Sequence, residues 1–169
     1  MRILAIAALG ISLIISPAIA SSINIVAFGA SNTNGKGVSS NEAFPAQIES
    51  MLRAKGVDAH VSVSAINGRD SAELLSAVDS EIPDGTTLVL IEPVRKNDEK
   101  HGLSMSENAS NLQAIKARLA QRKIKSVVVE MRPLPDDGLQ GDGQHLSPHG
   151  HQVVAARMAP KVLAMLRSH

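Results

Sequence analysis

The chain of 169 residues contains no cysteine, tryptophan or tyrosine, and its aromatic residues are Phe28 and Phe44. The absence of cysteine excludes disulfides, thiolate catalysis and zinc sites built from thiolates. Charge of neither sign dominates, because 17 Lys and Arg residues face 16 Asp and Glu residues. Without a basic stripe to contact phosphates or aromatic rings to stack on bases, the composition predicts no nucleic-acid partner.

Long apolar runs are absent after the first twenty residues. At the start, Arg2 precedes the apolar run Ile3–Ile15, and two alanines separated by one residue, Ala18 and Ala20, follow. This order is typical of a cleavable secretory signal, and the run is too short to span a bilayer comfortably. We expect residues 1–20 to be removed on export and residues 21–169 to form one periplasmic or secreted domain without stable membrane insertion. The alternative is an uncleaved N-terminal anchor.

Apolar runs alternate with segments of helical periodicity along the rest of the chain. The predicted strands are Ile23–Phe28, His60–Ile66, Leu88–Ile91 and Ser126–Val129. Helices are predicted between Asn41 and Gly56, after the capping boxes Asp70–Glu73 and Ser104–Glu107, and from Ser147 onward. This order predicts an α/β fold, a flavodoxin-like three-layer α/β/α sandwich with a parallel sheet. Its functional residues should follow the carboxyl ends of the strands.

The loop after the first strand contains a serine, Ser31, two residues beyond the strand end. A serine there can act as a nucleophile if a base removes its proton. Near the other end of the chain, Asp142 and His145 are three residues apart in a glycine-rich turn before the last helix. This spacing lets the carboxylate orient the imidazole, which makes His145 the candidate base.

Two other strand-end loops contain groups that could stabilise an oxyanion. Gly68 offers an unobstructed backbone N–H, and Asn97 offers a side-chain amide. Each candidate also has a purely structural interpretation: Ser31 and Gly68 as turn residues, Asn97 as part of the solvated run Arg95–Lys100, and Asp142 as a cap.

Together these residues resemble the SGNH or GDSL hydrolases, in particular their small secreted arylesterase, thioesterase and lysophospholipase branch. The segment Gly29–Gly35 is similar to the first block of that family, and the Asp-x-x-His spacing of Asp142 and His145 is similar to its fifth block. The resemblance implies that Ser31 is the nucleophile, and that its own N–H, Gly68 and Asn97 form the oxyanion hole.

The resemblance also implies a reaction. It predicts hydrolysis of acyl esters, thioesters or lysophospholipids through an acyl-enzyme on Ser31, with no metal or organic cofactor. The alternatives are O-deacetylation of a cell-wall glycan and a catalytically inactive protein of the same fold that binds a carbohydrate or a lipid.

The sequence departs from the family pattern at three places. Ala30 replaces an aspartate, so hydrogen bonds from that carboxylate around the nucleophile turn should be absent. The third block reads Val94-Arg-Lys-Asn97, without the usual glycine before its asparagine. Few residues separate Pro135 from Asp142, where the family usually has a helix and a fifth strand. We therefore expect a four-stranded sheet in the order 2-1-3-4 and a more open acyl site.

Two further interpretations compete with an esterase. The run from Ala30 to Gly35-Lys36 resembles a phosphate-binding loop, although Gly37 stands where such loops have Ser or Thr. A metal-binding module is the second, because three histidines and an aspartate lie close together in the sequence. They are His145, His149, His151 and Asp142. The structural alternative is that His149 and His151 are solvent-facing residues of the first helical turn.

Overall fold

The computed structural model describes residues 23–168, so the predicted export segment 1–20 lies outside the described residues. The strands are β1 (Ile23–Gly29), β2 (Ala59–Ala65), β3 (Leu88–Ile91) and β4 (Lys125–Val128). The helices are α1 (Phe44–Ala54), α2 (Ser71–Glu81), α3 (Arg95–Lys100), α4 (Met105–Gln121) and α5 (Pro148–Arg167). Every predicted strand is present with bounds within one residue of those expected.

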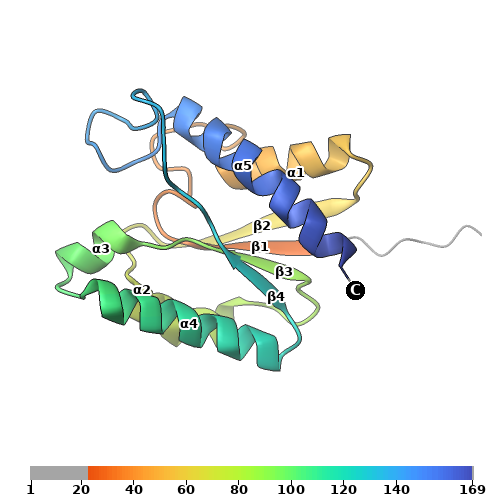
Figure 1. Ribbon diagram of the computed structural model, residues 1–169, viewed down its shortest axis with the longest axis horizontal. Coiled ribbons are helices and arrows are strands. Elements are labelled where there is room, and N and C mark those ends of the chain that lie inside the picture. Colours follow the sequence, from red (N-terminus) through yellow and green to blue (C-terminus); the bar gives the residue numbers. More distant parts are fainter. Residues whose placement is uncertain (1–22, 169) are drawn as a thin grey trace, which may run out of the picture.

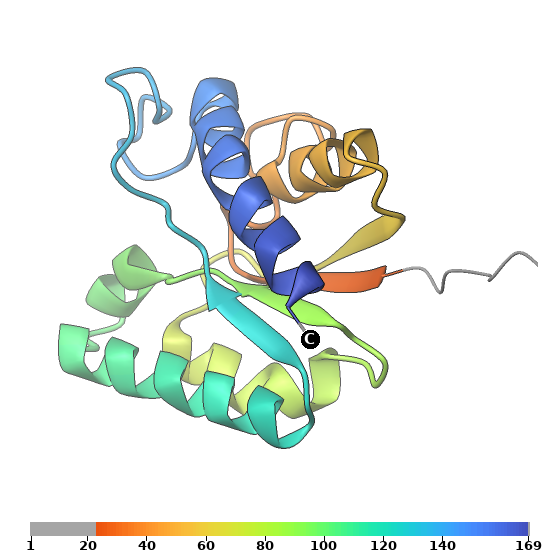
Figure 2. The ribbon, with the colours of Figure 1, turned by 45° about the vertical axis from the view of Figure 1, so that its right-hand side comes forward.

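The four strands form one parallel sheet in the order β2-β1-β3-β4, which confirms the predicted order. Helices α1 and α5 cover one face of the sheet, and α2 and α4 cover the other (Figures 1 and 2). The predicted three-layer α/β/α sandwich is therefore confirmed. Because β2 and β4 are the two edges, the loop after β4 leaves the sheet on an open side.

Alternation along β1 explains the two cores. Ile25 and Ala27 pack with α1 and α5, whereas Val26 and Phe28 pack with α2 and α4. Successive side chains of a strand point to opposite faces, so a central strand that is buried on both sides reads as a continuous apolar run.

Side-chain caps fix where the long helices begin. The capping boxes of Asp70 with Glu73 and of Ser104 with Glu107 are both complete. Ser147 Oγ accepts a hydrogen bond from the Gly150 N–H at 3.0 Å, so α5 begins at Pro148 as predicted. No helix of the described part of the chain has both the length and the apolar character that a membrane span requires.

Candidate active site

The turn that follows β1 is held by Glu92, at the end of β3. Its Oε2 accepts hydrogen bonds from the Ala30 N–H at 2.7 Å, the Thr33 N–H at 3.0 Å and the Thr33 hydroxyl at 2.7 Å. A Cβ on Gly29 would lie 2.5 Å from the Glu92 Cβ, so this close approach requires glycine. The turn therefore holds Ser31, which is 4% exposed, in one position at the strand end.

Ala30 brings no carboxylate to this turn, as expected, but Glu92, directly after β3, supplies carboxylate hydrogen bonds to it. Ala30 is fully buried in the apolar core formed with α2 and α4. An aspartate at this position would place a second carboxylate beside Glu92. Glu92 was not among the residues predicted from the sequence, although an acidic residue directly after an entirely apolar strand was an available signal.

The loop before α5 brings Asp142 and His145 to Ser31. His145 Nε2 lies 3.1 Å from Ser31 Oγ, and its Nδ1 lies 2.5 Å from Asp142 Oδ2. The other carboxylate oxygen of Asp142 accepts the backbone N–H groups of Gln144 at 2.9 Å and His145 at 3.0 Å. These hydrogen bonds, above all the one from the His145 side chain, lower the pKa of Asp142. The carboxylate is therefore ionised where it orients the imidazole.

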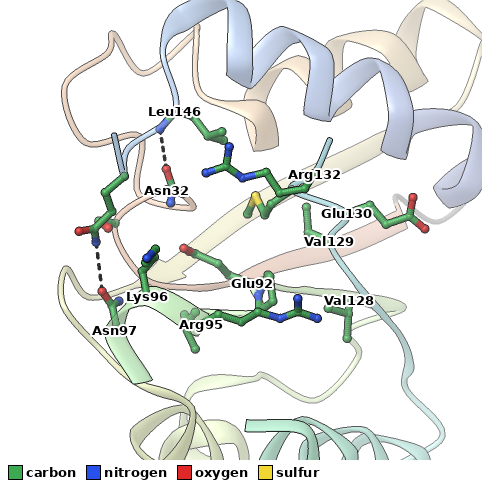
Figure 3. A pocket seen from close by; sticks show the side chains of 15 residues that line it. Asn32, Glu92, Arg95, Lys96, Asn97, Val128, Val129, Glu130, Arg132 and Leu146 are labelled. Atoms are coloured by element: carbon green, nitrogen blue, oxygen red, sulfur yellow. Dashed lines mark hydrogen bonds between the residues drawn. The ribbon is translucent and has the colours of Figure 1, made fainter. Parts of the chain in front are cut away.

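Antiparallel contacts shape this loop. Leu139 pairs with Leu146, and the Gln140 N–H donates to the His145 carbonyl at 2.8 Å. The Leu146 N–H donates to Asn32 Oδ1 at 2.8 Å, a contact drawn in Figure 3. The loop is thereby attached to the turn of Ser31, although the two segments are far apart in the sequence.

Gly68 lies beside the same site. It lines a recess of about 130 Å³ together with Ser31, Asn97 and His145. Its φ of 87° is in the left-handed region that favours glycine. Within residues 23–168, the N–H groups of Ser31 and Gly68 donate to no acceptor, which leaves both available to a ligand.

The loop of Gly68 is fixed through the next residue, Arg69. Its guanidinium makes a two-pronged contact with the Glu81 carboxylate, at 2.9 and 2.8 Å. Ser64 also donates to Glu81, at 2.6 Å. Since Arg69 is 8% exposed, this pair ties the loop to the end of α2 with little screening by water.

Asn97 lies in the short helix α3, which was not predicted from the sequence. Its Nδ2 donates to the Arg69 carbonyl at 2.8 Å, which leaves the second amide hydrogen for a ligand. Val94, the residue directly before α3, has a φ of 41°. This branched residue therefore adopts a backbone conformation that glycine would adopt more easily. The missing glycine of this block therefore does not prevent the turn that exposes the amide.

The next residue, Asp98, explains why α3 forms. Its carboxylate accepts the Ser71 N–H at 2.7 Å, the Ser71 hydroxyl at 2.8 Å and the Asn108 amide at 2.6 Å. The contacts join α3 to the beginning of α2 and to α4. Asp98 is buried, so what reads in the sequence as a solvated charged run is anchored from within.

A second, larger pocket opens on the other side of Ser31, with a volume of about 550 Å³ (Figure 3). It lies at the ends of β3 and β4, and Val128 and Leu146 contribute apolar walls. It lies on the side of the sheet where β4 is the edge strand.

The competing interpretations do not fit this arrangement. In a phosphate-binding loop the helix starts at the lysine, but here α1 starts at Phe44 rather than at Lys36. In the described part of the chain, the predicted metal ligands do not converge, and the carboxylate and imidazole groups that do are those of Asp70, Glu73 and His101.

His149 and His151, the two histidines of the predicted metal set that lie in α5, have different environments. His149 is exposed and pairs with Asp137 at 2.8 Å. The solvent-facing interpretation of His151 is wrong, because this residue is fully buried and accepts the Phe44 N–H at 3.2 Å. The helical register points His151 toward α1, so its surroundings come from tertiary packing.

No family model and no curated protein matches the sequence. Solved structures do. TesA has 17% identity and a TM-score of 0.74, over 84% of this chain and 99% of that chain. The psychrotrophic esterase EstA from Pseudoalteromonas sp. has 16% identity and a TM-score of 0.71, over 86% and 99%.

A mutant form of the esterase AlinE4 has higher identity, 28%, with a TM-score of 0.61 over 90% of this chain and 87% of that chain. AlinE4 is described as an SGNH-hydrolase family esterase. These similarities cover most of both chains and agree with the layer order described above.

Proposed function

We propose that the chain, which is similar to SGNH-hydrolase esterases of known structure over most of its length, is a serine esterase that cleaves acyl esters or thioesters through an acyl-enzyme on Ser31. The observation that carries the proposal is the continuous chain of contacts from Ser31 Oγ to His145 Nε2 and from His145 Nδ1 to Asp142. Arylesters, thioesters and lysophospholipids are the substrate classes proposed.

Each group has one task in this reaction. His145 takes the proton from Ser31 as Oγ attacks the carbonyl carbon, and then gives it to the leaving alcohol or thiol. Water, activated by the same imidazole, hydrolyses the acyl-enzyme and restores Ser31. Asp142 holds the imidazole in the tautomer whose Nε2 can accept a proton.

The oxyanion formed in both steps requires donors. The N–H groups of Ser31 and Gly68 and the second amide hydrogen of Asn97 border the same recess. Removing one such donor typically costs about 10²-fold in turnover. Asn97→Ala should therefore lower turnover by about this factor.

The direct test is hydrolysis of p-nitrophenyl acetate and butyrate, together with labelling by a fluorophosphonate that is measured by intact mass. We expect turnover and one label in the wild-type protein, and neither in Ser31→Ala. His145→Ala should lose nearly all turnover. Ser40→Ala is the matched control, because Ser40 is an exposed serine of the same loop. Wild-type turnover in Ser31→Ala would refute the mechanism, and a folded wild type without turnover or label would favour an inactive binding protein.

Removal of O-acetyl groups from a cell-wall glycan is the second candidate. The observation that favours it is the edge position of β4, which leaves the larger pocket uncovered on one side, where a polymer can approach. Acetate release from O-acetylated peptidoglycan, compared with p-nitrophenyl acetate, distinguishes the candidates. A higher kcat/KM on the polymer would favour the deacetylase.

We further propose that the enzyme acts in the periplasm or outside the cell after removal of residues 1–20. The support is the sequence pattern of that segment alone. Intact-mass measurement on protein from culture medium and cell fractions tests it, with Ser21 expected as the first residue.

A further inference from the structure

We propose that the larger pocket beside Ser31 selects esters that carry an anionic group, a carboxylate or a phosphate, near the scissile ester. This inference rests on the esterase function proposed above and specifies its substrate class. It comes from the charged side chains around the nucleophile, which the proposed reaction itself does not use.

Three cationic side chains line the larger pocket: Arg95, Lys96 and Arg132. In the described part of the chain, neither Arg95 nor Arg132 forms a salt bridge or donates a side-chain hydrogen bond. Lys96 contacts Glu99, an exposed residue of the same helix, at 2.9 Å. Arg95 and Arg132 line the same pocket as Ser31. Because neither has a carboxylate partner, both are available to bind an anionic group of a ligand.

Within residues 23–168, the two acidic residues of the pocket, Glu92 and Glu130, form no salt bridge with these arginines. Glu92 is 3% exposed, and its Oε2 is engaged by the turn of Ser31. Glu130 forms an ion pair with Lys161. Both carboxylates are therefore already engaged by groups other than the three pocket cations.

Figure 3 gives the directions of the three cations. Arg132 extends toward Asn32 and Leu146, Lys96 lies beside Glu92, and Arg95 extends toward Val128. Both guanidinium groups thus belong to the pocket that Ser31 also lines. Guanidinium groups bind carboxylates and phosphates through two parallel hydrogen bonds, which makes these anions the matching chemistry.

The smaller recess has the same sign of charge, because Lys36 and Lys100 line it. The sequence as a whole has almost equal numbers of basic and acidic residues. The cations near Ser31 are therefore a local excess, produced by the fold at one edge of the sheet. Such an excess attracts anionic substrates and accelerates their association, an effect that salt screens.

The walls of the larger pocket indicate the rest of the ligand. Val128, Val129, Met131 and Leu146 provide apolar surface in the same pocket. The volume of about 550 Å³ suits a small molecule with an apolar part. The pocket thus favours an ester that carries an apolar portion as well as the charge.

Matched pairs of esters test the inference with the wild-type protein. One pair places the charge on the leaving group: 4-acetoxybenzoate and its neutral methyl ester, with 4-acetoxyphenyl phosphate to distinguish phosphate from carboxylate. The other places it on the acyl group: mono-4-nitrophenyl adipate and 4-nitrophenyl methyl adipate. We expect kcat/KM for at least one anionic ester to exceed that of its neutral partner by about tenfold at low salt, and the ratio to fall toward one in about 0.5 M NaCl.

Variants assign the effect to the pocket. Arg132→Gln and Arg95→Gln should each lower the anionic-to-neutral ratio by about fivefold. Arg167→Gln is the matched control, because Arg167 is an exposed arginine in the last turn of α5, at the opposite end of the sheet. Thermal melting of each variant establishes that it is folded.

The outcomes separate the two proposals. If the folded protein hydrolyses none of the esters, the esterase proposal fails. If it hydrolyses the neutral esters, but every anionic partner is equal or slower and Arg132→Gln leaves the ratios unchanged, the esterase stands and the anion selectivity is overturned. If the anionic-to-neutral ratio of kcat/KM fell as much in Arg167→Gln as in the two pocket variants, the assignment of the selectivity to the pocket would also be overturned.

Discussion

The Glu92 carboxylate lies 2.7 Å from the backbone nitrogen of Ala30, the residue before the proposed nucleophile. It also accepts two hydrogen bonds from Thr33, so one side chain directly after β3 holds both sides of the turn. β3 lies next to β1 in the sheet, in parallel register with Ile91 opposite Phe28. Strand pairing therefore sets where Ser31 stands.

Weakening that support should affect stability and reactivity together. We expect Glu92→Gln to lower the free energy of unfolding by about 1–3 kcal/mol, because the amide replaces a buried charged acceptor of three hydrogen bonds. The rate of fluorophosphonate labelling at Ser31 should fall as well. Thr33→Val removes one donor from the same network, so a double-mutant cycle should give effects that are not additive. Additive effects with an unchanged labelling rate would contradict a positioning role for Glu92.

Gly68 and Gly85 form a matched pair for testing the oxyanion donor. Their φ angles are 87° and 84°, and a Cβ on either would meet nothing within 4 Å. Gly68→Ala and Gly85→Ala should each destabilise the fold by about 1 kcal/mol through backbone strain. Only Gly68→Ala should lower kcat/KM, by about tenfold or more, because the strained loop turns its N–H away from the recess. Equal kcat/KM in the two variants would remove Gly68 from the proposed oxyanion hole.

Asp142 has a role that an amide cannot fill. In Asp142→Asn, an NH₂ group can face His145 Nδ1 and favour the tautomer whose Nε2 carries the proton, which cannot act as a base. We expect kcat to fall by about 10²-fold or more with little change in melting temperature, since Asp142 is exposed. The measurement is kcat of the wild type and of Asp142→Asn from steady-state kinetics at alkaline pH. Activity close to that of the wild type would mean that another group orients the imidazole.

His151 should make stability depend on pH. Burial lowers its pKa to about 4, and its Nδ1 accepts the Phe44 N–H, so the folded protein holds the neutral ring. The unfolded chain binds a proton at a pKa of about 6.5, so the unfolded state gains stability as the pH falls below that value. The free energy of unfolding should therefore be unaffected by this group above about pH 6.5 and decrease by about 3 kcal/mol as the pH falls to about 4.

Urea denaturation between these pH values, compared for wild type and His151→Gln, isolates this contribution. The variant should have a shallower slope. His60→Gln is the control, because His60 is an exposed histidine. An unchanged slope in His151→Gln would exclude His151 as the source of the pH dependence.

Much of the candidate site could be predicted from the sequence because its members follow strands or lie close together in the chain. Ser31 follows an apolar strand, and Asp142 and His145 are three residues apart in one turn. Parallel strands bring their carboxyl ends to one edge of the sheet, which is why separate loops could be expected to meet. The roles of these residues remain predictions, and the structure adds the distances that join them.

The alternation of apolar runs with amphipathic helices determined by itself the layer order, the parallel sheet and the edge position of β2. These features follow from local periodicity and from the right-handed connection of parallel strands. Only the tertiary structure decided that Glu92 supports the Ser31 turn, that His151 is buried, that Asp98 anchors α3, and that Arg95 and Arg132 flank one pocket. Each of these depends on contacts between segments distant in the chain, which a pattern of neighbouring residues does not encode.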